Sequence, residues 1–178
     1  LAAKKLELLK EAVPRAKRIA FLSPDDPAMQ GQIAEARRAA AALGQELAVV
    51  TVRGGDHAGA FAAIAAERAQ AVYVGAHTSL VTDRQAVIQL ALRHNLPTMW
   101  EWPEQVRDGG LMAYGTSLTG LYERIADYID RVFKGMRIAD MPIEQPTTFG
   151  LVLNRGTARA IGLELPRALL LRADEVVE

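Results

Sequence analysis

The chain has 178 residues, half of them hydrophobic, and its 21 basic residues balance its 21 acidic residues. A chain of this length can bury one good core, but no run of like charges supplies the electrostatic footprint that nucleic acid or an anionic membrane requires, so we expect no nucleic-acid partner. The absence of cysteine excludes disulfides, thiolate metal sites and a cysteine nucleophile, although it is compatible with a reducing or an oxidising compartment.

Helical and strand-like segments alternate along the first part of the chain. Residues 1–13 place Leu6, Leu9 and Val13 on one helical face, and the helix is expected to stop at Pro14. Four strand-and-helix units follow in chain order: 18–23 with 28–43, 46–52 with 56–70, 71–77 with 78–95, and 96–102 with 103–110. Apolar strands alternating with amphipathic helices predict a parallel sheet covered on both faces, and so a doubly wound α/β domain.

An amphipathic helix stands apart from this alternation. Residues 113–135 indicate a strand end, a helix from Ser117 to Lys134 and a stop at Gly135. One face of this helix carries an apolar stripe, made of Leu121, Ile125, Tyr128, Val132 and Phe133. A proline-rich connector over 135–146, a strand over 147–154 and a short helix over 155–163, capped by Asn154, are predicted next.

The loops after the strands are the expected ligand site, because open α/β sheets bind ligands at the carboxyl ends of their strands. These loops bring hydroxyls, carboxylates, an imidazole and aromatic rings to one edge, as a small-molecule cleft requires. The candidate ligand-binding residues are Ser23, Asp25, Asp26, His77, Thr78, Trp100, Glu101 and Tyr114. A structural interpretation stays open for several: the two aspartates and Thr78 suit helix N-termini, and a tryptophan in a strand suits a core.

Catalytic and cofactor motifs are absent from the sequence. There is no G-x-S-x-G elbow, phosphate-binding loop or dinucleotide fingerprint, and His57, His77 and His94 lack the spacing of a helical metal site. Asp25 and Glu101 could serve as an acid and base pair at one edge, but nothing else supplies a nucleophile or an oxyanion site. We therefore expect no enzyme activity, no cofactor and no metal.

Several stretches together resemble a known family. They are "KKLELLKEAVPRAKRIAFLSPDDP", "LPTMWEWPEQVRDGGLMAYGTSL", "IADYIDRVFKGMRIADMPIEQPTTFGLVLN" and "TARAIGLELPRALLLRADEVVE". The chain resembles the second half of the ABC-transporter substrate-binding proteins that include tryptophan and tyrosine binders. The resemblance implies one lobe of a type I periplasmic binding protein, a Rossmann-like three-layer αβα sandwich that closes on a small organic solute and delivers it to an ABC permease. It also implies a missing amino-terminal lobe, preceded by a secretion signal, and a periplasmic or lipid-anchored location.

The resemblance implies a division of the chain into three parts. Residues 1–115 would form the carboxy-terminal ligand-binding lobe, 116–140 a crossover helix packed on the missing lobe, and 141–178 a return strand with a helix and tail. Without that lobe, the crossover helix is expected either to fold onto its own sheet or to drive a homodimer or domain swap.

Two loops depart from the pattern that is usual in relatives. The first loop is "SPDDP" where relatives often have Asn-Pro-x-Asn-Pro, which favours a cationic ligand group, and the fourth is "MWEWPEQVRDGG", where an aromatic ligand part could stack. Two other functions stay open, namely a ligand-sensing domain of a regulator and an α/β enzyme that modifies a small molecule.

Overall fold

The computed structural model describes residues 1–142 and 149–178, and within them the strands form one mixed sheet. The strand order is β2-β1-β3-β4-β5-β6-β7. Strands β1 to β5 run parallel, β6 is antiparallel to β5, and β7 is parallel to β6. The bounds are β1 Arg18–Pro24, β2 Glu46–Val52, β3 Ala71–Val74, β4 Thr98–Trp100, β5 Met112–Gly115, β6 Gly150–Asn154 and β7 Glu175–Val177.

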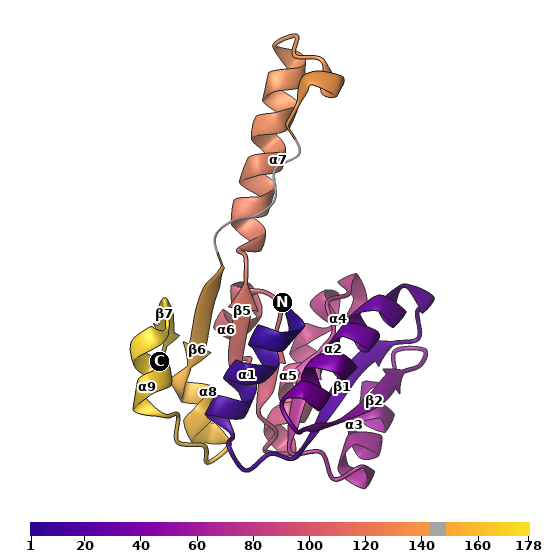
Figure 1. Cartoon of the computed structure of the whole chain (residues 1–178), viewed down its shortest axis with the longest axis vertical. Coiled ribbons are helices and arrows are strands. Elements are labelled where there is room, and N and C mark those ends of the chain that lie inside the picture. Colours follow the sequence, from indigo (N-terminus) through magenta and orange to yellow (C-terminus); the bar gives the residue numbers. More distant parts are fainter. Residues whose placement is uncertain (143–148) are drawn as a thin grey trace.

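Helices cover both faces of this sheet. In the described residues they are α1 Ala2–Ala12, α2 Gln30–Ala42, α3 His57–Ala66, α4 Thr78–Thr82, α5 Arg84–Arg93, α6 Pro103–Arg107, α7 Leu118–Phe133, α8 Arg155–Ala160 and α9 Arg167–Arg172, with 3-10 turns at Pro27–Met29 and Ile138–Asp140. The predicted doubly wound α/β fold, a three-layer αβα sandwich, is confirmed (Figure 1).

The alternation of side chains along β1 explains the two cores. Ile19 and Phe21 pack with α1, α2, α8 and α9 on one face, whereas Ala20 and Leu22 pack with α3, α5 and α6 on the other. Successive side chains of a strand point to opposite faces, so a strand that is apolar at every position needs a helical layer on each side.

Three details differ from the sequence-based expectation. The predicted helix over 78–95 is divided at Asp83 into α4 and α5, and 175–177, expected to be tail, form β7 beside β6. A short helix, α9, also precedes this strand. Residues 143–148, which include part of the predicted connector and the first residues of the predicted strand over 147–154, lie outside the described residues.

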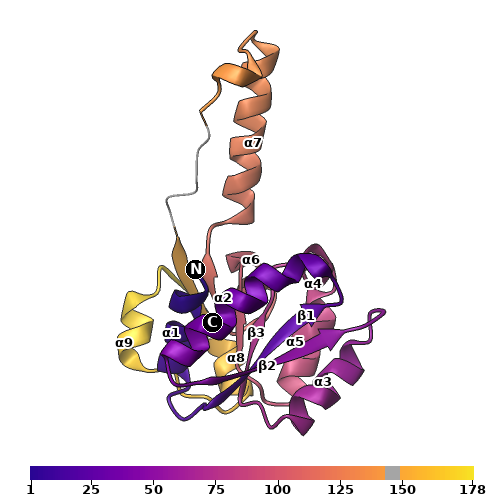
Figure 2. The same ribbon diagram turned by 45° about the vertical axis from the view of Figure 1, so that its right-hand side comes forward.

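Helix α7 extends away from the sandwich, as Figures 1 and 2 show from two directions. Ser117 caps it by accepting a hydrogen bond from the N–H of Gly120 at 3.2 Å, yet none of its residues is buried. The alternative in which this helix folds onto its own sheet is therefore wrong. The exposed apolar face consists of Leu121, Tyr122, Ile125, Ile129, Val132 and Phe133.

This face is centred differently from the predicted stripe. Ile129 belongs to it, whereas Tyr128 lies at its border and donates a hydrogen bond through its hydroxyl to the carbonyl oxygen of Pro142 at 2.9 Å. Tyr128 thereby ties α7 to the start of the returning segment instead of extending the apolar surface.

Candidate functional site

The carboxyl ends of the parallel strands meet at the edge of the sheet from which α7 leaves (Figure 1). A hollow of about 260 Å³ opens there between α1, α2 and the loops after β3 and β4. We call it the edge hollow; it is lined by Leu1, Ala2, Lys5, Gln32, Glu35, Tyr73, Ala76, Glu101 and Trp102. Of the predicted site residues, Glu101 alone lines this hollow.

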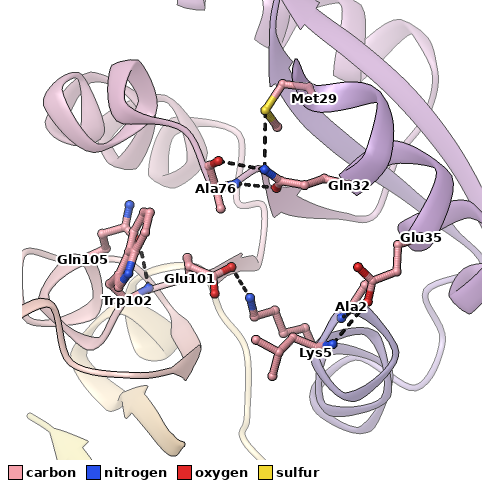
Figure 3. A network of polar contacts seen from close by, with 10 residues as sticks. Ala2, Lys5, Met29, Gln32, Glu35, Ala76, Glu101, Trp102 and Gln105 are labelled. Carbon is pink, nitrogen blue, oxygen red and sulfur yellow. Dashed lines mark hydrogen bonds and ion pairs between the residues drawn. The ribbon is translucent and has the colours of Figure 1, made fainter. Parts of the chain in front are cut away.

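An ion pair between Lys5 and Glu101 forms the floor of the edge hollow (Figure 3). The side chain of Lys5 is 1% exposed and that of Glu101 is 18% exposed. Burial lowers the pKa of Lys5, and the neighbouring Glu101 carboxylate opposes that change. Burial removes water from both charged groups, which costs free energy, so the surrounding residues must hold the two side chains in good hydrogen-bonding geometry.

A second carboxylate, Glu35, lies on α2 beside the start of α1. It accepts hydrogen bonds at 3.2 Å from the backbone N–H of Ala2 and from the amino group of Leu1. The N–H of Ala2 is the main cause that holds the pKa of Glu35 below its usual value. Glu35 thus supplies a partner to backbone N–H groups that α1 leaves unpaired at its beginning.

Gln32 shapes the opposite side of the hollow. Its side-chain amide donates to the carbonyl oxygen of Ala76 at 2.9 Å, and its side-chain oxygen accepts from the N–H of Ala76 at 3.0 Å. Both ends of the amide are therefore engaged with the backbone of the loop after β3, so Gln32 fixes that loop against α2.

Aromatic side chains flank the ion pair. Trp102 is half-buried, and its backbone N–H donates to the side-chain oxygen of Gln105 at 3.1 Å at the start of α6. The Tyr73 ring lies 5.8 Å from the Lys5 nitrogen, and burial raises the pKa of Tyr73, which keeps its phenol protonated. The edge hollow accordingly combines charge with aromatic surface.

The close approach of β5 to Glu101 depends on a glycine. A Cβ atom at Gly115 would lie 1.9 Å from the backbone oxygen of Glu101, so no larger residue fits without moving the backbone. Gly115 therefore lets the last residue of β5 pass beside the loop that carries Glu101, at the base of α7.

The loop after β1 lies beside a separate depression of about 260 Å³, which Ser23, Asp25 and Asp26 help to line. Ser23 is buried and its hydroxyl donates to the carbonyl oxygen of Pro24 at 2.9 Å. Asp25 is exposed, and its carboxylate lies 3.7 Å from the side chain of Arg53. The sequence grouped these residues with Glu101, but the structure places them in a different hollow.

Asp26 and His77 contact each other across the loops after β1 and β3. The backbone N–H of Ser79 donates to Nδ1 of His77 at 3.2 Å, so Nε2 carries the proton and faces the Asp26 carboxylate at 3.2 Å. The N–H of Ala28, followed by His77, holds the pKa of Asp26 below its usual value. Both side chains thus cap turns, as the structural interpretation expected of Asp26, while Thr78 is exposed and lines neither hollow.

Trp100 and Tyr114 do not line the edge hollow. Trp100 is fully buried in the core, and its indole N–H donates to the hydroxyl of Thr98 at 2.8 Å. It therefore lies away from the edge hollow, as the core interpretation of a strand tryptophan anticipated. Tyr114 is half-buried and stacks on Phe149, with ring centroids 6.1 Å apart, where the chain leaves and re-enters the sheet.

Sequence reasoning missed Lys5, Gln32 and Glu35 as lining residues, and it considered Trp102 only as part of the fourth loop, where an aromatic ligand part could stack. Lys5 did carry a signal, because it shares a helical face with Ala2, Leu9 and Ala12, which are all buried. A lysine on the apolar face of a helix requires a partner, and here that partner is 96 positions away.

Neither a metal cluster nor a membrane span is found in the part of the chain that the structure describes. No group of three or more His, Asp or Glu side chains there could hold a metal ion. Among the same residues, no helix is long and apolar enough to cross a bilayer.

The chain belongs to the family of ABC transporter substrate-binding proteins, because the model of that family matches residues 1–177. The predicted resemblance is confirmed by this match. No curated protein matches the chain significantly.

Three solved structures show the same fold. A conserved domain protein from Vibrio cholerae O1 biovar El Tor is 23% identical with a TM-score of 0.87, and the alignment covers 98% of this chain and 60% of that one. An ABC domain in complex with L-Trp from Streptococcus pneumonia is 22% identical with a TM-score of 0.86, covering 99% and 62%. A ligand-free, open substrate binding protein with adhesive properties from Clostridium difficile is 19% identical with a TM-score of 0.71, covering 98% and 59%. The chain thus spans about 60% of the length of these neighbours.

Proposed function

We propose that this chain is one lobe of the solute-binding component of an ABC uptake transporter, and that the edge hollow is its wall of the ligand cleft. The observation that carries the proposal is the position of the hollow: it lies at the carboxyl ends of the strands, beside the residues where α7 leaves the sheet. In a family of substrate-binding proteins, that is the edge at which an open α/β sheet receives a small molecule.

The path of the chain supports a second lobe. Strand β5 leads out to α7, and β6 returns antiparallel beside it, with Gly115 opposite Gly150. The segment between them therefore leaves and re-enters at one place and carries an apolar face that the sandwich does not cover. Because the chain spans about 60% of its structural neighbours, we propose that a further lobe covers this face and forms the other wall of the cleft.

The ligand class follows from the relatives and the edge hollow together. A structural neighbour is in complex with L-Trp, and the hollow here presents Trp102 and Glu101 side by side. We propose a small organic solute, with an amino acid as the leading class, bound outside the cytoplasmic membrane and handed to the membrane permease.

The decisive experiment is mass spectrometry of small molecules released on denaturing the complete two-lobed protein after gentle purification. We expect one small organic compound in stoichiometric amount, and calorimetry should show that it rebinds to the stripped protein. A protein that releases nothing and binds no solute from a broad library would contradict the proposal. Uptake of the same compound in cells lacking the protein then tests delivery to the permease.

A further inference from the structure

Glu101 faces the edge hollow while its counter-charge lies behind it. The Glu101 side chain is 18% exposed, whereas that of Lys5 is 1% exposed, and the two form an ion pair. A molecule in the hollow therefore meets more of the Glu101 side chain than of the almost fully buried Lys5 side chain. Lys5 holds this carboxylate in place (Figure 3), so its influence on a ligand acts through Glu101.

Carboxylates outnumber the ammonium group around the buried ion pair. Glu35 also attracts the Lys5 ammonium, so two carboxylates share one buried lysine whose pKa burial lowers. Glu35 also accepts a hydrogen bond from the backbone N–H of Ala2 at 3.2 Å. Glu101 is consequently a hydrogen-bond acceptor held in place by Lys5, and the charge of Lys5 compensates only part of the negative charge of the two carboxylates.

The other lining groups are already engaged or apolar. The amide of Gln32 is paired at both ends with the backbone of Ala76, and burial keeps the phenol of Tyr73 protonated by raising its pKa. Trp102 adds an aromatic surface directly after Glu101 in the chain. Aromatic faces attract cations, and a carboxylate accepts its strongest hydrogen bonds from charged donors.

The geometry points to a subsite for a cationic nitrogen: Glu101 accepts hydrogen bonds from a primary ammonium group of the ligand, Trp102 contacts the adjoining carbon skeleton, and Lys5 is a positioning residue for Glu101. This assignment rests on the proposed function and narrows its substrate class to amino acids and small amines. A volume of about 260 Å³ in one wall suits such a group.

The test uses the complete two-lobed protein and calorimetry with defined probes. The probes are the common L-amino acids, tryptamine and putrescine, each compared with an analogue in which the amine is absent. We expect at least one ammonium-bearing probe to bind, with a preference over its deaminated analogue of about tenfold to a hundredfold, the range expected for a hydrogen bond between charged groups. Glu101→Gln should abolish most of this preference.

A second variant separates recognition from folding. Glu101→Gln alone leaves Lys5 buried without its partner, which destabilises a protein, whereas Lys5→Met combined with Glu101→Gln removes both charges at similar volume. Both variants should lose the preference for the ammonium probe over its analogue. Glu67→Gln, which removes a carboxylate outside the edge hollow that pairs with Arg18, should keep it.

Each other outcome overturns the assignment. If the folded double variant retains the preference, Glu101 has a purely structural role. If only neutral or acidic solutes bind, the subsite is wrong while the proposed solute-binding function stands. If no solute binds and none is released on denaturation, the proposed function fails as well.

Discussion

Trp100 and Trp102 are two residues apart, yet the structure gives them different roles. Trp100 is fully buried and hydrogen-bonded to Thr98, while Trp102 is half-buried and lines the edge hollow. Trp100 therefore stabilises the sandwich, and Trp102 is the aromatic residue available to a ligand. These are the only two tryptophans of the chain, which makes the pair a matched comparison.

Replacing Trp100 with alanine should lower the free energy of unfolding by about 3 to 5 kcal/mol, because it leaves a large cavity and removes a buried hydrogen bond. Urea unfolding of the lobe measures this loss. Trp102→Ala is the matched control, for which we expect a much smaller loss of stability but weaker ligand binding in the two-lobed protein. Equal destabilisation by both substitutions would contradict the division of roles.

Glu104 is a single residue that anchors a whole helix. Its carboxylate accepts hydrogen bonds from the hydroxyl of Ser117 at 2.9 Å and from the N–H of Thr119 at 3.4 Å, and so fixes the start of α7 to α6. Burial disfavours the charged form of Glu104, but these donors and neighbouring backbone N–H groups outweigh it and hold its pKa below the usual value.

Because the pKa of Glu104 is lower in the folded than in the unfolded protein, its hydrogen bonds stabilise the folded protein at pH values above the unfolded pKa of about 4.3. This contribution is lost as the pH falls through the pKa of Glu104 in the folded protein. We therefore expect Glu104→Gln to reduce hydrogen-exchange protection at the first turn of α7 at neutral pH. The difference in protection factors between wild type and variant should shrink as the pH falls below about 4. A difference that grows on acidification would contradict the anchoring role.

Helix α7 is not covered by the sandwich. It is amphipathic and capped, yet Phe133 is 86% exposed and Tyr122 is 66% exposed. Large contiguous apolar surface of this kind is uncommon on a monomer and typically marks an interface. The predicted homodimer or segment exchange of residues 1–178 remains a prediction.

We expect residues 1–178 to associate at high concentration through this face, and Ile125→Glu combined with Ile129→Glu to restore a monomer, since both side chains lie near its centre. Light scattering over a range of concentrations measures the mass. Glu123→Lys changes a charge on the opposite side of the helix and should leave association intact. A wild-type chain that stays monomeric throughout would rule out this role for the face.

At the scale of the whole molecule, the edge hollow would form only one of the two walls of the proposed cleft. Contacts and desolvation in a two-walled cleft come from both sides, and closure of two lobes removes the ligand from water. The edge hollow is thus expected to hold only part of the binding energy.

Residues 1–178 alone should bind the solute released from the two-lobed protein about a thousandfold more weakly, which corresponds to a loss of about 4 kcal/mol of interaction free energy. Calorimetry on both proteins with the same solute measures the ratio. Equal affinities would show that the site is complete within one lobe, and the proposed interlobe cleft would then be wrong.

The sequence by itself determined the doubly wound sheet, the edge at which its loops gather, and an amphipathic helix after the fifth strand. Those properties follow from local periodicity, because a strand buried on both faces must be apolar throughout and a half-covered helix must be apolar on one side. The resemblance to substrate-binding proteins likewise rested on contiguous motifs, which the family match confirmed.

Only the tertiary structure decided which polar side chains share a hollow. Lys5 and Glu101 are 96 positions apart, and their contact depends on how α1 packs beside β4, which no local pattern encodes. The same holds for Trp100 and Trp102, since the end of β4 falls between them and only packing decides which ring enters the core. Ser23, Asp25 and Asp26 line a different hollow from Glu101, although the sequence grouped all four at one edge, because strand order positions a loop while side-chain packing decides what it faces.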